Sequence, residues 1–337
     1  MRRWWIELPF AGSCLSTSRL TITEPAAIQP LDTKAQMHSR LRLRHNQVST
    51  FVGQNHCVIL KMEFILYFFE KIFFRFVRLV RCIRLRSTIT CDFDGSKNWG
   101  DSLTPVIIER LTGRKCQKPC FKFQDRFFVI GSILERVDAR SFVYGAGFMY
   151  DHSSPKGVPK EIFAVRGPLS RQIFLAHDIS CPPVYGDPAI LLGDFYPREK
   201  LNEKKYGIIP HYIDKNNNWV SRQLIKFKHE VLLIDIEGGI EYVINEVVRC
   251  EYIISSSLHG LICADVYGIP NIRVVLSNLV QGGDFKFHDY RLGVGCKPHK
   301  VIDPNRLDLN LPDLIKYSSL ANIDKAKADI LENNPFK

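Results

Sequence analysis

The chain has 337 residues, and 45% of them are hydrophobic, which supplies enough apolar material for two domains with sizeable cores and excludes disorder of the whole chain. The net charge of +11 is concentrated at one end, because residues 1–91 hold 14 Lys or Arg against 5 Asp or Glu, whereas the remainder is only +2. A nucleic-acid enzyme would normally spread its basic surface over the folded body, so this distribution argues against nucleic acid as a partner.

The ten cysteines are scattered, several lie within apolar runs, and no cleavable secretory signal precedes them. This pattern predicts a reducing compartment and therefore a cytoplasmic protein. Cys116 and Cys120 form the closest pair, but no second pair or histidine lies at ligand spacing. We therefore expect core or loop thiols and no metal site.

Residues 1–61 show no sustained apolar period, so we expect a poorly ordered N-terminal extension. The abrupt change of composition at Met62 suggests that the working protein starts at Met37 or Met62.

Residues 62–86 are rich in Phe, Ile and Leu, but acidic and basic residues interrupt them, and no stretch reaches the roughly 18 apolar residues that cross a bilayer. The range 62–91 is therefore predicted to hold a basic amphipathic helix that contacts anionic lipid at the inner face of the membrane. A core helix or a partner-docking helix is an equal alternative.

The body of the chain begins near Asp92, where short apolar runs start to alternate with helical stretches, as in βα repeats. Strands are expected at residues 127–130, 142–144, 162–165, 206–210, 231–235, 252–255 and 271–276. The polar segment 195–205 is interpreted as a linker between two α/β domains, an N-terminal one at 92–195 and a C-terminal one at 206–300, with a helical tail at 301–337. We expect the site in a cleft between the two domains.

The most informative segment is ISSSLHGLICADVYGIP at 254–270, which sets His259 where an apolar strand at 252–254 gives way to a helix at 261–267. Strand-to-helix junctions at the carboxyl edge of a parallel sheet are where α/β proteins bind ligands. Ser256 and Ser257 add hydroxyls beside the imidazole, and a purely structural histidine is the alternative. His211 follows an earlier predicted strand, 206–210, in IIPHY, so the two imidazoles are expected at the same edge of one sheet.

Three further segments before the linker carry candidate site residues. Asn98, Gly100 and Asp101 lie in NWGDSL, a composition typical of a βα turn whose backbone approaches a ligand, although a simple N-cap by Asp101 is equally compatible. Arg166 follows a predicted strand directly, and a guanidinium there can bind a carboxylate or a phosphate, with a surface ion pair as the alternative. Asp187, in YGDPAILL, is expected either in the site or as a helix cap.

The last candidate is Lys286 in GGDFKFHDY, where a flexible loop, a lysine and aromatic residues suit an anion or a sugar ring. A solvated charge is the alternative interpretation. The sequence contains no Walker phosphate loop, GxGxxG fingerprint or HExxH helix, which removes the commonest nucleotide and zinc-protease functions.

Six of these segments, in this order, resemble the polysaccharide pyruvyl transferase family, and most of all its bacterial exopolysaccharide ketal transferases. The likeness extends from about Asp92 to Gly295 and rests on NWGDSL, VRGPLSR, YGDPAILL, IIPHY, SSSLHGLICADVYGIP and GGDFKFHDY.

The resemblance implies two Rossmann-like domains that face a cleft, similar to the GT-B glycosyltransferase architecture. It also implies a reaction in which phosphoenolpyruvate donates its three-carbon unit to two hydroxyls of one sugar and forms a cyclic ketal. The acceptor would be a glycan or a lipid-linked oligosaccharide in exopolysaccharide or cell-surface glycan biosynthesis, and no cofactor or metal is required.

Under this hypothesis His259 is the general acid or base, and His211 is its alternative or a partner of the phosphate. Arg166 and Lys286 would hold the negative charge of the donor, and Ser256 and Ser257 would hydrogen-bond its phosphate. The family pattern makes Asn98, Gly100, Asp101 and Asp187 pocket residues. Two other functions remain open: a glycosyltransferase that uses a nucleotide sugar, and a non-catalytic glycan-binding protein at the membrane.

Overall fold

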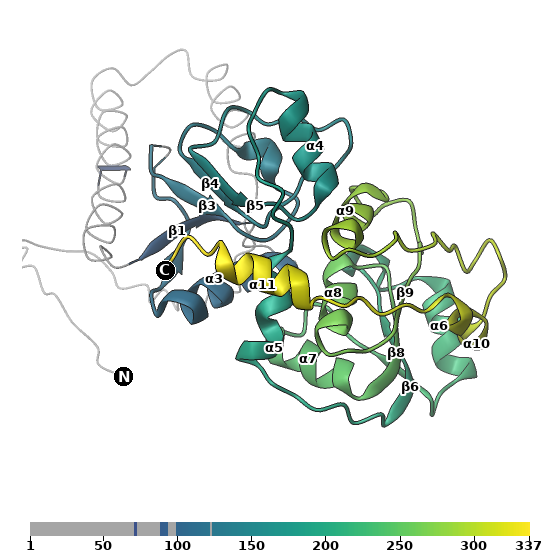
Figure 1. Cartoon of the computed structure of the whole chain (residues 1–337). Coiled ribbons are helices and arrows are strands. Elements are labelled where there is room, and N and C mark those ends of the chain that lie inside the picture. Colours follow the sequence, from purple (N-terminus) through teal and green to yellow (C-terminus); the bar gives the residue numbers. More distant parts are fainter. Residues whose placement is uncertain (1–70, 73–87, 94–98, 122) are drawn as a thin grey trace, which may run out of the picture. The chain divides into compact units, whose positions relative to one another are not determined.

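The computed structural model describes residues 71–72, 88–93, 99–121 and 123–337 (Figure 1). It divides into two units, Met1–Phe73 and Phe74–Lys337, and Lys71 and Ile72, both helical, are the described part of the first unit. The predictions for the extension 1–61, for most of the basic helix at 62–86 and for Asn98 therefore lie outside the described residues. None of the helices in the described ranges combines the length and apolar character needed to cross a membrane.

The first sheet is five-stranded and parallel, in the order β2-β1-β3-β4-β5. Its strands are β1 (Ile89–Asp92), β2 (Cys116–Gln117), β3 (Arg126–Phe128), β4 (Ser141–Tyr144) and β5 (Glu161–Ala164). The helices between and after them are α3 (Trp99–Thr112) and α4 (Pro168–Ala176). Strands β1 and β2 were not predicted, because β1 lies next to the basic segment and β2 is only two residues long.

The second sheet is four-stranded, also parallel, in the order β7-β6-β8-β9. Its strands are β6 (Lys204–Ile209), β7 (Val231–Leu233), β8 (Cys250–Ser255) and β9 (Asn271–Arg273), and its helices include α6 (Asn218–Lys226), α7 (Ile240–Val248) and α8 (Leu258–Val266). Strand β9 is shorter than expected, since Val274 makes only an isolated bridge, to Ile302. Helix α8 begins before the predicted residue 261, so His259 lies inside its first turn.

These two parallel sheets confirm the predicted mixed α/β class. Parallel strands are buried on both faces and read as apolar runs, which is why their positions were visible in the sequence. The inner residues of β6 and β8 show this directly, because Ile208, Ile209, Ile253 and Ile254 have no exposed surface. The carboxyl ends of the strands are followed by the polar residues that form the site.

Two segments join the sheets. The 3₁₀ turn Pro188–Leu191 and α5 (Leu192–Phe195) precede residues 197–203, which have no regular secondary structure and lead into β6. The C-terminal segment contains α10 (Leu311–Leu314) and α11 (Asp324–Glu332) and returns to the first sheet, as the yellow ribbon in Figure 1 shows.

Two contacts hold this segment against the first sheet. The hydroxyl of Tyr144 donates to the carbonyl of Ile330 at 2.9 Å, and the rings of Phe127 and Phe336 are 4.6 Å apart. Earlier in the same segment, Ser319 bridges antiparallel to Asn271 of β9. The last residues of the chain therefore contact both sheets.

Candidate functional site

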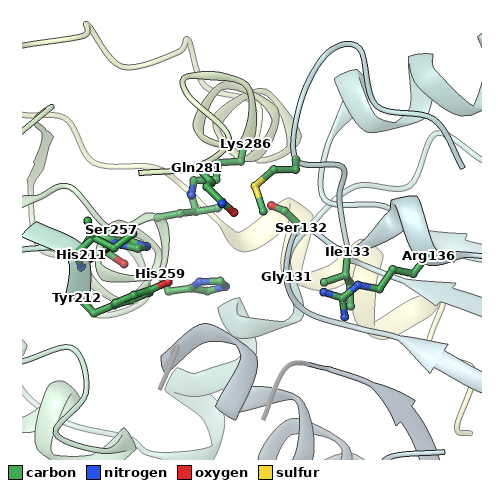
Figure 2. A pocket seen from close by; sticks show the side chains of 13 residues that line it. Gly131, Ser132, Ile133, Arg136, His211, Tyr212, Ser257, His259, Gln281 and Lys286 are labelled. Atoms are coloured by element: carbon green, nitrogen blue, oxygen red, sulfur yellow. Dashed lines mark hydrogen bonds between the residues drawn. The ribbon is translucent and has the colours of Figure 1, made fainter. Parts of the chain in front are cut away.

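A cavity of about 220 Å³ lies where loops from both sheets face each other. Figure 2 shows its two walls. The wall from the first half of the body is formed by Gly131, Ser132, Ile133, Arg136 and Met149, and the wall from the second half by His211, Tyr212, Ile213, Ser257, Leu258, His259, Gln281 and Lys286. Four of these residues were candidates in the sequence: His211, Ser257, His259 and Lys286.

His259 is the second residue of α8 and is 7% exposed. The turn before it is held by Ser255, whose side-chain oxygen accepts the backbone N–H of Ser257 at 3.0 Å. The ring packs against Gly100 of α3, because a Cβ added at Gly100 would lie 2.0 Å from His259 Nδ1. The glycine of NWGDSL therefore makes room for the imidazole, whereas the sequence had suggested a backbone that approaches the ligand itself.

Asp187 faces His259 from the other half of the body. Its Oδ2 lies 3.7 Å from His259 Nε2, and both atoms are buried without a hydrogen-bond partner. Its Oδ1 accepts the backbone N–H of Ala189 at 3.0 Å, so the aspartate also caps the 3₁₀ turn that follows. The separation is too long for a hydrogen bond, but a carboxylate there can orient the ring and offset the charge that the ring gains with a proton.

His211 lies just beyond β6. Its Nδ1 accepts the backbone N–H of Ile213 at 3.3 Å, and its own backbone N–H donates to Ser256 Oγ at 2.9 Å. Burial and the nearby Lys286 charge lower the pKa of His211 to about 4. The ring is therefore neutral at pH 7, and because Nδ1 is the acceptor, its proton lies on Nε2.

Positive charge lines the pocket on both sides. Lys286, in the first turn of α9 (Phe285–Gly293), is 8% exposed, and Arg136 lies across the cavity with its guanidinium 3.2 Å from Asp92. The N-terminus of α8 adds backbone N–H groups that have no partner within the helix. Together these groups favour an anion. Within the described ranges, no group of three His, Cys, Asp or Glu side chains could hold a metal ion.

Comparison with known proteins places the chain in a family. A sequence profile described as "Polysaccharide pyruvyl transferase" matches residues 113–278, which include His211 and His259. The chain belongs to the polysaccharide pyruvyl transferase family. This membership supports a pyruvyl transferase role in polysaccharide biosynthesis.

Two curated relatives accompany the family match. The "Uncharacterized protein L143" of Acanthamoeba polyphaga mimivirus is 30% identical over 231 residues, which cover 63% of this chain and 78% of the viral protein. The "Succinoglycan biosynthesis protein ExoV" of Rhizobium meliloti (strain 1021) is 29% identical over 184 residues, or 51% of this chain and 55% of ExoV. The chain thus matches about half the length of ExoV.

Arg166, in the family segment VRGPLSR, does not line the pocket. Its side chain is fully buried and each of its nitrogens donates within the protein: Nε to Asp289 at 3.0 Å, Nη1 to Ser132 at 2.6 Å, and Nη2 to the Phe148 carbonyl at 2.6 Å. Arg166, predicted to hold the donor, thus uses its hydrogen-bonding capacity one layer behind the wall of the pocket.

Ser256 and Ser257, of the family segment SSSLHG, lie in different surroundings. Ser256 is 3% exposed, and its hydroxyl donates to Asp214 Oδ2 at 2.7 Å while it accepts the N–H of His211. Ser256, predicted to bind phosphate, lines a neighbouring cavity, whereas Ser257 lines the pocket. Asp101 lies in α3.

Sequence reasoning also missed part of the pocket. Gly131 and Ser132 directly follow a predicted strand, so the strand-end argument that selected His211 and His259 would have found them too. Arg136, Met149 and Gln281 carried no comparable signal, because each reaches the cavity from a loop or a short turn whose path the sequence does not reveal.

Proposed function

We propose that this family member transfers the pyruvyl group of phosphoenolpyruvate to two hydroxyls of one sugar, forming a cyclic ketal during exopolysaccharide or cell-surface glycan biosynthesis. The observation that carries the proposal is the pairing of His259 with Asp187 in a small cationic pocket. We also propose that the domains 92–195 and 206–300 correspond to the two Rossmann-like halves of a GT-B-like architecture, with the reaction between them.

The donor is a small molecule with a carboxylate and a phosphate, and the pocket matches both properties. Its volume of about 220 Å³ is below the roughly 300–1,000 Å³ of drug-sized sites, which suits a three-carbon donor better than a nucleotide sugar. Lys286, Arg136 and the N-terminus of α8 attract the two anionic groups. No cofactor or metal enters the scheme.

The reaction forms two C–O bonds at C2 of the donor and breaks the bond from C2 to the phosphate oxygen. The first sugar hydroxyl attacks C2 and loses its proton, while the methylene carbon gains one and becomes a methyl group. The second hydroxyl then displaces phosphate and closes the ring, and its proton leaves with the phosphate. The balance is one diol and one phosphoenolpyruvate giving one ketal and one phosphate.

His259 is the proposed proton carrier in this sequence. It accepts the proton of an attacking hydroxyl and delivers a proton to the methylene carbon, while Asp187 keeps the ring oriented. His211 has a different role, because the low pKa of its ring keeps it neutral at working pH. Its Nε2–H donates a hydrogen bond to the phosphate of the donor, and Ser257 contributes its hydroxyl.

The decisive experiment incubates the full-length protein with phosphoenolpyruvate and a panel of glycans, and follows phosphate release together with glycan mass. A ketal raises the glycan mass by that of pyruvic acid less one water, whereas a glycosyltransferase adds a sugar residue and requires a nucleotide sugar. Replacement of His259 by Ala should lower kcat by roughly 100-fold or more with an unchanged melting temperature. Phosphoenolpyruvate turnover unaffected by this change would refute the role of His259.

We further propose that the acceptor is a glycan or a lipid-linked oligosaccharide, and that residues 62–86 bring the protein to the inner face of the membrane. Replacing Arg75, Arg78, Arg81 and Arg84 by Gln in the full chain should abolish co-flotation with anionic vesicles. Equal flotation of the two proteins, or none by either, would remove the membrane contact from the proposal.

A further inference from the structure

A buried ion pair connects the two halves of the body immediately behind the pocket. Asp289 of α9 has no exposed surface and lies 3.0 Å from Arg166, which follows β5 in the other half. The same carboxylate accepts the backbone N–H of Ser170 at 3.0 Å and its hydroxyl at 2.6 Å, at the N-terminus of α4. One carboxylate therefore ties α9 to both β5 and α4.

Three glycines lie at this junction, and two of them allow the halves to approach closely. A Cβ on Gly167 would lie 1.8 Å from the Asp289 carbonyl oxygen, and one on Gly293 would lie 2.2 Å from the Arg166 carbonyl oxygen. A Cβ on Gly147 would lie 2.3 Å from the guanidinium carbon of Arg166. The contact between the halves thus depends on missing side chains at Gly167 and Gly293, which leaves α9 little freedom to shift relative to α4, and Gly147 makes room for the guanidinium within the first half.

The ion pair also reaches both walls of the pocket. On one side, Arg166 Nη1 donates to the hydroxyl of Ser132, and Nη2 donates to the backbone carbonyl of Phe148, the residue before Met149. On the other side, Lys286 lies one turn before Asp289 on the same helix, and both Ser132 and Lys286 line the cavity. Ser132 of one wall and Lys286 of the other are therefore connected through the guanidinium of Arg166 and the carboxylate of Asp289.

The next residue of α9 extends the connection to the catalytic helix. The hydroxyl of Tyr290 donates to Asp265 Oδ2 of α8 at 3.0 Å, in a buried contact. Because α8 carries His259, the contacts of Asp289 and Tyr290 hold Lys286 in place relative to both the first half of the body and the imidazole.

We infer that Arg166 and Asp289 form a positioning pair that sets Ser132 and Lys286 at a fixed separation across the pocket. Stability alone is a weak reason for such a pair, because buried ion pairs can often be replaced by uncharged residues without loss of stability. The expected effect of this pair on activity rests on the proposed function, whereas its expected effect on the positions of Ser132 and Lys286 does not.

The central test compares Arg166→Lys with a matched control, Arg171→Lys. Lysine keeps the charge beside Asp289 but cannot bond Asp289, Ser132 and Phe148 with one planar fork. Arg171 lies nearby on α4 and donates to the Cys181 carbonyl, away from the pocket. For Arg166→Lys, kcat/KM for phosphoenolpyruvate should fall about 10- to 100-fold, chiefly through KM, while the control stays near the wild-type value.

A second pair of variants separates position from stability. Arg166→Met leaves the Asp289 carboxylate buried without a counter-charge, so its melting temperature should fall by roughly 6–20 °C. Adding Asp289→Asn removes that charge and preserves an acceptor for Ser170, so the double variant should recover most of the melting temperature. Its kcat/KM should remain low, because Ser132 still lacks its partner.

Recovery of both stability and activity in the double variant would show that the pair is only structural. Wild-type kinetics in Arg166→Lys would overturn the inference as well, even where the double variant does not fold. If the wild-type protein shows no phosphoenolpyruvate turnover, amide hydrogen exchange decides: Arg166→Lys should speed exchange at 131–133 and 285–289, and Arg171→Lys should not. Unchanged exchange there would refute the positioning pair independently of the reaction.

Discussion

Gly100 offers the sharpest test of the site, because it lies behind the imidazole and outside the pocket lining. A Cβ at this position would lie 2.0, 2.1 and 2.5 Å from Nδ1, Cε1 and Cγ of His259, whereas ordinary contacts begin at 3.4 Å. Gly100→Ala therefore requires the ring, or α3 itself, to move by about 1.4 Å, the difference between 3.4 and 2.0 Å.

A displacement of that size should reduce kcat roughly 100-fold, since a misplacement of about 1 Å can cost that factor. The free energy of unfolding should fall by about 1–3 kcal/mol, the usual cost of overpacking a buried position, because the preference of helices for alanine is smaller than this cost. The variant should therefore remain folded at the assay temperature, so a loss of kcat of this size reports the displaced imidazole rather than unfolding.

The assay is phosphate release from phosphoenolpyruvate in the presence of an accepted glycan, with thermal unfolding measured in parallel. Gly157→Ala is the matched control, because its Cβ would meet only ordinary contacts, the nearest at 3.6 Å. If Gly100→Ala keeps both its turnover and its melting temperature, the position of His259 does not govern the chemistry, and the assignment of the proton carrier fails.

Two other predictions follow from the charges in the pocket. Lys286→Met should raise the KM for phosphoenolpyruvate about 10- to 100-fold with a much smaller change in kcat, because a charged hydrogen bond to the donor is lost; an unchanged KM would exclude Lys286 as a donor ligand. Because the pKa of His211 is lowered to about 4 in the folded protein, its imidazole stays neutral as the pH falls below about 6.5, whereas the same imidazole gains a proton in the unfolded chain. The free energy of unfolding therefore decreases as the pH falls from about 6.5 towards about 4. In His211→Asn, which retains an acceptor for Ile213, the melting temperature should fall less between pH 7 and pH 5, and an equal fall in both proteins would contradict the neutral buried imidazole.

Much of the fold was open to prediction because its signals are local. Apolar runs bounded by turn residues located every strand of the second sheet, and the α/β class followed from their alternation with helices. The misses have local causes too. Strand β2 is too short to form a pattern, and β1 follows a stretch whose composition suggested a helix.

The candidate site was predicted best where a residue directly follows a strand. His211, Ser257 and His259 share one sheet edge, so chain position alone brought them to the same cavity as the more distant Lys286. Arg166 also follows a strand, but it does not line the cavity. A strand end can face the cleft or the interior, and the choice was made by Asp289, which lies 123 residues further along the chain.

The amino-acid sequence by itself determined the α/β class, the family and most of the residue types from which a donor pocket can be built, since these depend on patterns within a few turns or strands. Tertiary structure alone decided which of those residues face the cavity. The physical reason is that burial and charge pairing depend on residues far away in the chain: Asp289 and Asp187 pair with Arg166 and His259 of the opposite half, and Asp214 accepts the hydroxyl of Ser256 within the same half.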